Sequence, residues 1–267
     1  MFKDNLVDDV LFMTAPNIET KHAFTTRFGG ASDGIYKSMN LGLSVGDDRQ
    51  TVFENYSRLC EAIEITTDEL VFSRQVHGAD VSVVTRSDTG SLRNQTTRQA
   101  DGLITNESNV ALMVFAADCV PILLHDPIKA AIGAIHAGWR GTAANIVGIA
   151  IKKMETTFGS LPGNIQAAIG PCISNCCFET DYDVVSALIL TLGENADKCY
   201  YSHSGKYMVD LKKANTLLIK HAGVNNISVS DECTSCNSDK YWSHRKTKGR
   251  RGSQAAVIVN RKELAFS

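Results

Sequence analysis

The sequence of 267 residues shows no pattern typical of a domain linker, a membrane span or a signal peptide. It has no low-complexity stretch, no repeat of fixed period and no linker rich in proline or serine. No apolar run reaches the ~18 residues of a membrane span. The first ten residues, MFKDNLVDDV, lack the basic-then-apolar order of a signal peptide. We therefore expect one domain over residues 1–267, cytoplasmic and with no membrane partner.

An excess of charge is also missing, since 27 Lys and Arg face 29 Asp and Glu. This balance does not favour nucleic acid as a partner. The local exception is the basic segment Tyr241–Arg251. It is either a solvated loop or, as we prefer, a loop that brings His244 and Arg245 to an anionic group of a substrate.

Eight cysteines are present, and in a reducing compartment they favour metal binding, catalysis or burial over disulfides. We expect at least half of them in the core. Cys172, Cys176 and Cys177 have no histidine nearby in sequence, so structural thiols are favoured over a second metal site. Cys233 and Cys236 form one CxxC without a second pair, which does not support a zinc ribbon and only weakly suggests a redox pair.

Hydrophobic periodicity and capping residues predict alternating helices and strands. This irregular alternation favours the α/β class, with a mixed sheet and helices outside. The predicted helices are 48–63, 142–158 capped by Thr142, 181–192 and 210–221. The predicted strands include 70–76, 81–85, 165–169, 227–230 and 255–259.

The stretch Ala111–Gly141 contains a predicted hairpin of two apolar strands, 120–124 and 130–135. The turn Asp126-Pro-Ile-Lys129 joins them. If the turn is centred between Pro127 and Ile128, Cys119 lies opposite His136, with Cβ atoms roughly 5 Å apart. A turn of odd length would reverse the face. Pro121 lacks a donor for the ladder, so this strand should be an edge strand or bulged.

His77, at the end of a predicted strand, is the candidate third ligand of a site built by Cys119 and His136. One cysteine and two histidines are a known set for catalytic zinc with an open fourth position. Three alternatives remain open. The residues are core side chains, or a metal-free pair with Cys119 as nucleophile and His136 as base, or a copper site.

The glycine-rich turn after His136 has two open interpretations: Gly138 and Gly141 merely turn the chain, or the turn builds an anion site beside this cluster. His136-Ala-Gly-Trp-Arg-Gly141 runs into a helix, whose N-terminal amides attract anions. Arg140 would bind substrate with His244 and Arg245, and Arg74 is a candidate catalytic residue. Asp118 is a candidate acid–base residue only if the chain bulges, because a regular strand points it away from the face of Cys119.

Seven motifs follow one another along the chain: RQVHGAD, ADGLIT, ADCVPILL, IHAGWRGT, IGPCIS, DLKKAN and SHRKTKGRRG. In this order they resemble the YfiH-type laccase-domain family, also called the multicopper polyphenol oxidase-like or purine nucleoside phosphorylase family. The resemblance covers roughly residues 21–259. Two departures are the segment Ser243–Arg250, where the family usually reads closer to SxRRxxxxGR, and the cysteines Cys176 and Cys177.

The resemblance implies a layered α/β/β/α fold with mixed sheets and a zinc ion on His77, Cys119 and His136. It implies phosphorolysis of adenosine, inosine and methylthioadenosine with phosphate, and deamination of adenosine. A cysteine hydrolase or a peptidoglycan-editing amidase-like enzyme is the alternative.

Copper oxidation, suggested by the older family name, is less favoured by the sequence. A laccase needs a trinuclear copper cluster fed by paired His-x-His motifs, and this chain has none. The site can hold one ion but not a multicopper relay. The seven histidines stand singly, at His22, His77, His125, His136, His203, His221 and His244.

Overall fold

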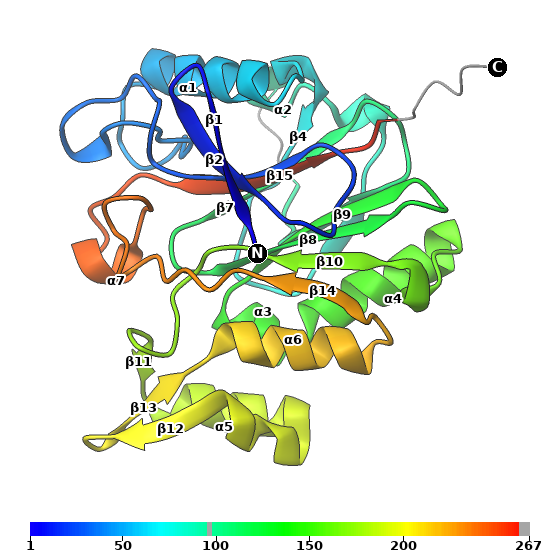
Figure 1. The fold of residues 1–267 in the computed structure, drawn as a ribbon, viewed down its shortest axis with the longest axis vertical. Coiled ribbons are helices and arrows are strands. Elements are labelled where there is room, and N and C mark those ends of the chain that lie inside the picture. Colours follow the sequence, from blue (N-terminus) through cyan, green and yellow to red (C-terminus); the bar gives the residue numbers. More distant parts are fainter. Residues whose placement is uncertain (95–97, 262–267) are drawn as a thin grey trace.

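Two six-stranded sheets stack face to face, and helices cover both outer faces (Figure 1). The computed structural model describes residues 1–94 and 98–261, so residues 95–97 and 262–267 of the expected domain lie outside the described residues. This arrangement confirms the α/β/β/α layering and the mixed sheets. In the described part of the chain, no helix is long and apolar enough to cross a membrane.

The first sheet contains the first and the last strand of the described residues, β1 and β15, and is antiparallel except where β4 pairs with β7. Its spatial order is β1-β2-β3-β15-β7-β4. These strands span, in that order, Lys3–Val7, Val10–Thr14, His22–Thr25, Gln254–Val259, Ala111–Ala116 and Leu70–Val71.

The second sheet carries the predicted hairpin at its centre, with parallel pairs at both edges. Its spatial order is β14-β10-β8-β9-β6-β5. These strands span, in that order, Asn226–Val229, Gln166–Ile169, Val120–Asp126, Ala131–Ala137, Gly102–Thr105 and Val81–Val83.

Helices α1 (Arg49–Ala62) and α2 (Ser91–Asn94) lie outside the first sheet, while α3, α4 and α6 lie outside the second (Figure 1). Beyond α6 are α5 and a small antiparallel sheet, and α7 precedes β15. The remaining helices are α3 Trp139–Ala143, α4 Ile146–Phe158, α5 Tyr182–Leu192, α6 Leu211–His221 and α7 His244–Thr247. The small sheet is formed by β11 Glu179–Thr180, β13 Lys206–Val209 and β12 Tyr200–His203.

The core has three parts, and the middle one joins the sheets. It packs Val114 and Ala256 of the first sheet with Leu123 and Ala134 of the second. The other two parts fill the space beneath α1 and beneath the helices of the opposite face. Because the two sheets share buried side chains, we infer that they form one domain.

The predicted helix 142–158 is interrupted in the structure, so the assignment of Thr142 as its cap is wrong. The hydroxyl of Thr142 is buried and accepts a hydrogen bond from Asn215 at 2.9 Å. Helix α3 ends before Asn145, which adopts φ 56° and caps α4 through the amide of Gly148. The segment therefore forms two helices, α3 and α4, in place of one, and α3 begins directly after Gly138.

Candidate metal centre and active site

Three side chains from separate segments converge, as the sequence predicted. The ligand atoms of His77, Cys119 and His136 all lie within 4.8 Å of one another. The two imidazole rings meet nearly at right angles, with centroids 4.9 Å apart. His77 follows the short β4, Cys119 precedes β8 and His136 lies near the end of β9.

The register of the β8–β9 hairpin differs from the prediction. Pro121, not Cys119, lies opposite His136, because the turn takes in Ala130 and moves the register by two residues. A shift of two preserves the face, so Cys119 stays on the side of His136. Strand β8 is interior, so the expected edge strand is wrong. The irregularity falls at Asp118, which has φ 87° just before the strand.

Asp101 organises the ligands from beneath and is completely buried. Its Oδ1 accepts a hydrogen bond from His136 Nδ1 at 2.8 Å and one from the amide of His77 at 3.0 Å. Its Oδ2 accepts from the amides of Val76 and Gly78 at 3.1 and 2.8 Å. The carboxylate therefore leaves Nε2 of His136 to face the site. It also holds His77 in a left-handed conformation of φ 59°.

The cluster favours a charged sulfur. Burial raises the pKa of the Cys119 thiol, but His136 and His77 beside it outweigh burial and lower this pKa to about 6. Burial lowers the pKa of His136, but Cys119 and Asp101 raise it to about 9. At neutral pH and without a metal, the site thus holds a thiolate beside an imidazolium, and a thiolate is the form that binds metal.

Gly138 explains why the ligands can approach so closely. A Cβ there would lie 3.3 Å from both Cys119 Sγ and His77 Cδ2. Gly141 packs against the loop of His77, because a Cβ at this position would lie only 2.9 Å from the Gly78 carbonyl oxygen. The glycines of the HAGWRG motif therefore leave space for the cluster as well as turning the chain.

A cavity of about 410 Å³ opens over the cluster. This is within the size range of small-molecule sites. Three aromatic rings, Phe115, Trp139 and Phe178, line it together with the cluster and several cationic side chains. Gln75 fixes one wall, because its amide both donates to and accepts from the backbone of Phe115, at 2.8 and 2.6 Å.

Asp118 lines this cavity, as a bulged chain allows, but both of its oxygens already accept hydrogen bonds. Thr234 donates its hydroxyl at 2.6 Å, and the Arg245 amide donates at 2.6 Å. These bonds anchor the start of α7 and the loop of Thr234. They favour a positioning role for Asp118 over the predicted acid–base role.

The predicted substrate-binding residues Arg140, His244 and Arg245 also line the cavity. Arg140 lies over the Trp139 ring, 4.1 Å from its centroid. The Arg245 guanidinium donates to the carbonyl oxygens of Cys177 and Glu179, at 3.1 and 2.9 Å. Arg74 is exposed and is not part of the lining, so the structure does not bring it to the cluster.

Two polar residues of the site were not singled out from the sequence. Asp101 lies in the ADGLIT motif, but nothing local shows that it bonds to a histidine 35 residues away. Arg251 belongs to the basic segment and lines the cavity, and its Nε is buried with no hydrogen-bond partner in the described structure. Burial lowers the pKa of its guanidinium, with Asp118 and Cys119 opposing.

The fold and the cluster define a mixed α/β protein with a Cys–His–His group at the floor of a cavity. Comparison with known proteins agrees: residues 21–261 match the family described as "Multi-copper polyphenol oxidoreductase laccase". The chain belongs to this family.

Two curated relatives in this family are named purine nucleoside phosphorylases. YlmD from Geobacillus stearothermophilus is 42% identical over 245 residues, which cover 90% of this chain and 89% of the relative. A Deinococcus radiodurans relative is 37% identical over 247 residues, covering 92% and 91%. The crystal structure of Geobacillus stearothermophilus YlmD matches with a TM-score of 0.92 at 39% identity, covering 98% of this chain and 99% of that one.

Proposed function

We propose that the chain is a zinc-dependent purine nucleoside phosphorylase of the cytoplasm. Its substrates would be adenosine, inosine and methylthioadenosine, and deamination of adenosine would be a second activity of the same site. The observation that carries the proposal is the cluster of His77, Cys119 and His136 on the floor of a cavity with aromatic and cationic walls. The names of the relatives support the reaction class.

The residues of the cluster fit a single zinc ion. A thiolate and two imidazoles form a donor set of catalytic zinc sites, and the buried Asp101 supplies the carboxylate that commonly orients a ligating histidine. Copper is the less favoured ion. Bound by His77, Cys119 and His136, zinc would supply a Lewis acid and lower the pKa of a bound water.

The aromatic walls suit a purine base. Phe115, Trp139 and Phe178 are each only partly exposed and line the cavity above the cluster. A planar base can be enclosed by such rings, and each ring excludes water from the reacting sugar. The two apolar rings, Phe115 and Phe178, come from the end of β7 and from the loop before β11, so they stand on different segments of the wall.

The cationic rim suits phosphate. Phosphorolysis breaks the bond between the sugar carbon and the base nitrogen and forms a bond between that carbon and a phosphate oxygen, while the departing base takes up a proton. The anion must therefore lie against the sugar. Arg140, His244 and Arg251 line the cavity and carry donors that suit an anion. The guanidinium of Arg245 is engaged with loop carbonyls. Nη1 of Arg251 donates to the next two residues, which leaves the Nε of Arg251 as a buried donor without a partner in the described structure.

Product analysis tests this reaction. Purified protein would be incubated with adenosine in the presence and absence of phosphate. Adenine and ribose 1-phosphate, formed only with phosphate, support phosphorolysis. Inosine formed without phosphate supports deamination. The proposal would be overturned if neither reaction gave a product.

Arg140→Ala should raise the KM for phosphate by roughly 10- to 100-fold, since a charge-assisted hydrogen bond contributes roughly 1.5–3 kcal/mol and each 1.4 kcal/mol is a factor of ten. The zinc content should stay unchanged, because Arg140 is not part of the Cys–His–His cluster. Initial rates at varied phosphate and metal analysis measure both quantities. Arg74→Ala is the matched control, since this exposed arginine does not line the cavity. An unchanged phosphate dependence in Arg140→Ala would remove this arginine from the phosphate site.

A cysteine hydrolase is a second candidate, because Cys119, His136 and Asp101 form a chain in which each residue contacts the next. In this arrangement His136 would take a proton from Cys119 while Asp101 holds its tautomer. The two candidates differ in their dependence on metal.

A further inference from the structure

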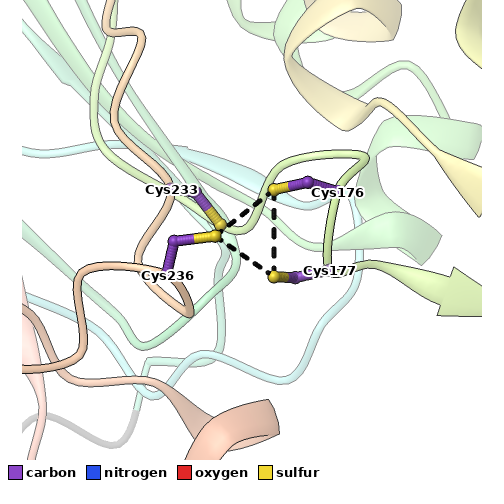
Figure 2. A group of neighbouring side chains, drawn as sticks. All are labelled: Cys176, Cys177, Cys233 and Cys236. Carbon is purple, nitrogen blue, oxygen red and sulfur yellow. Dashed lines mark hydrogen bonds between the residues drawn. The ribbon is translucent and has the colours of Figure 1, made fainter.

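Four cysteines from two loops that are far apart in sequence meet where strands β10 and β14 of the second sheet end. Cys176 and Cys177 lie in the loop after β10, and Cys233 and Cys236 lie in the loop after β14 (Figure 2). Because β10 and β14 are parallel neighbours, their carboxyl ends lie side by side and the two loops emerge together. The CxxC, which has no second pair in its own segment, obtains one from the adjacent cysteines of the other loop.

The backbone holds the two loops together independently of the thiols. Cys172 and Cys233 form a parallel bridge, and the Thr234 amide donates to the Cys172 carbonyl at 3.1 Å. The Ser174 amide donates to the sulfur of Cys233 at 3.4 Å. A hydrogen bond from an amide to sulfur stabilises the thiolate, which is the form that binds a metal.

The sulfur separations match those of four ligands on one ion. Cys236 Sγ lies 3.5 Å from Cys176 Sγ and 3.4 Å from Cys177 Sγ, and the latter two are 3.8 Å apart. All four sulfurs lie within 4.8 Å of one another. With zinc–sulfur bonds of about 2.3 Å, the edges of a tetrahedron of sulfurs measure about 3.8 Å. A cluster of two or four irons would need some of its cysteine sulfurs farther apart, because they would bind different irons.

We propose that Cys176, Cys177, Cys233 and Cys236 bind one zinc ion as a closed tetrathiolate site, separate from the cluster of His77, Cys119 and His136. Four thiolates leave no open coordination position, which is typical of structural zinc. The role is therefore structural: the ion ties the loop after β10 to the loop after β14.

One loop lines the cavity and the other supports a residue of the lining, so this ion would stabilise the cavity wall. The first loop contributes Ile173 and Phe178 to the lining, and its Cys177 carbonyl accepts a hydrogen bond from Arg245. The second loop lies behind the lining, where the Thr234 hydroxyl donates to Asp118. Loss of the ion should loosen these contacts and increase hydrogen exchange in residues 170–178 and 231–237, with the first metal cluster left intact.

Metal stoichiometry tests the proposal. We expect two zinc ions per chain in the unmodified protein and one in Cys176→Ser/Cys236→Ser. The matched control is Asn175→Ser/Ser238→Ala, which changes neighbouring positions of the same two loops and should retain two. Cobalt substitution identifies which site is lost, since the thiolate charge-transfer absorption of four sulfurs should disappear and that of one sulfur should remain.

A second measurement avoids variants that fail to fold. Crystals of the unmodified protein should show two anomalous peaks at the zinc edge, one of them enclosed by the four sulfurs. A single peak at the Cys–His–His cluster, a disulfide among the four cysteines, or iron in place of zinc would each overturn the proposal. The outcome is independent of the proposed function, because the second ion can be counted whether or not adenosine is cleaved.

Discussion

Cys119→Ala is expected to remove the zinc proposed for the cavity and to lower the proposed phosphorolysis by about three orders of magnitude. The expected size follows because the Lewis acidity of a bound metal contributes several kcal/mol, and each 1.4 kcal/mol is a factor of ten in rate. Cys119 supplies the only thiolate of the cluster, and alanine has no donor to replace it. Two imidazoles alone bind zinc less firmly than two imidazoles and a thiolate. Metal analysis and the rate of ribose 1-phosphate formation measure both effects.

Cys60→Ala is the matched control. This cysteine is buried in α1 against the first sheet and outside the cavity, so the same substitution should leave zinc and activity near the unmodified values. A chelator separates the metal enzyme from the cysteine hydrolase. We expect chelation to abolish activity and added zinc to restore it. Activity that survives chelation but not thiol alkylation would favour Cys119 as a nucleophile instead.

The central hairpin shows how far the sequence determines the site. The alternation of side chains along two strands predicts the shared face of Cys119 and His136, and that prediction is independent of an error of two residues in the register. Turn length was harder to predict, because Asp126 accepts hydrogen bonds from the amides of both Ile128 and Lys129 and so helps to form a longer turn. The face was therefore predictable, while the exact partner was not.

Contacts between distant segments were not predictable from local patterns. The strand predicted for residues 70–76 ends at Val71, and the amides of residues 76–78 bond to the carboxylate of Asp101 instead of a neighbouring strand. The four-cysteine group is a similar case. Neither loop contains a complete metal motif, and the parallel pairing of β10 with β14 brings the two halves together.

Burial of cysteine was predicted correctly in number, since Cys60, Cys172, Cys199 and Cys233 are buried. The sequence did not show which cysteines cluster. The structure also leaves Arg74, the candidate catalytic residue, outside the cavity lining although it is close to His77 in sequence, whereas Arg251 lines the cavity from near the other end of the chain. Proximity in sequence to a cluster residue therefore does not by itself place a side chain in the cavity.

Asp101→Asn is expected to lower zinc affinity by 10- to 100-fold, which is about the effect of removing the carboxylate behind a ligating histidine. The side chain keeps its shape, but one oxygen becomes an amide group that donates. Two of the four donors around Asp101 then lose their acceptor, whichever way the amide is oriented. Chelator competition measures the affinity. In metal-free protein, the free energy of unfolding should fall by about 3 kcal/mol, from roughly 1–3 kcal/mol for each unsatisfied donor.

Acid provides an internal check on Asp101. Burial raises the pKa of its carboxyl, but hydrogen bonds from His136 and the Gly78 amide outweigh burial, so the folded pKa lies below the ordinary value. A depressed pKa stabilises the fold above the unfolded pKa of about 3.9 and loses this contribution as pH falls through the folded pKa. The difference in unfolding free energy between the unmodified protein and Asp101→Asn should therefore be full at pH 7 and shrink below pH ~4. Asp80→Asn, an exposed carboxylate in the loop that contains His77, is the matched control. Equal zinc affinity in both variants would mean that Asp101 does not orient His136.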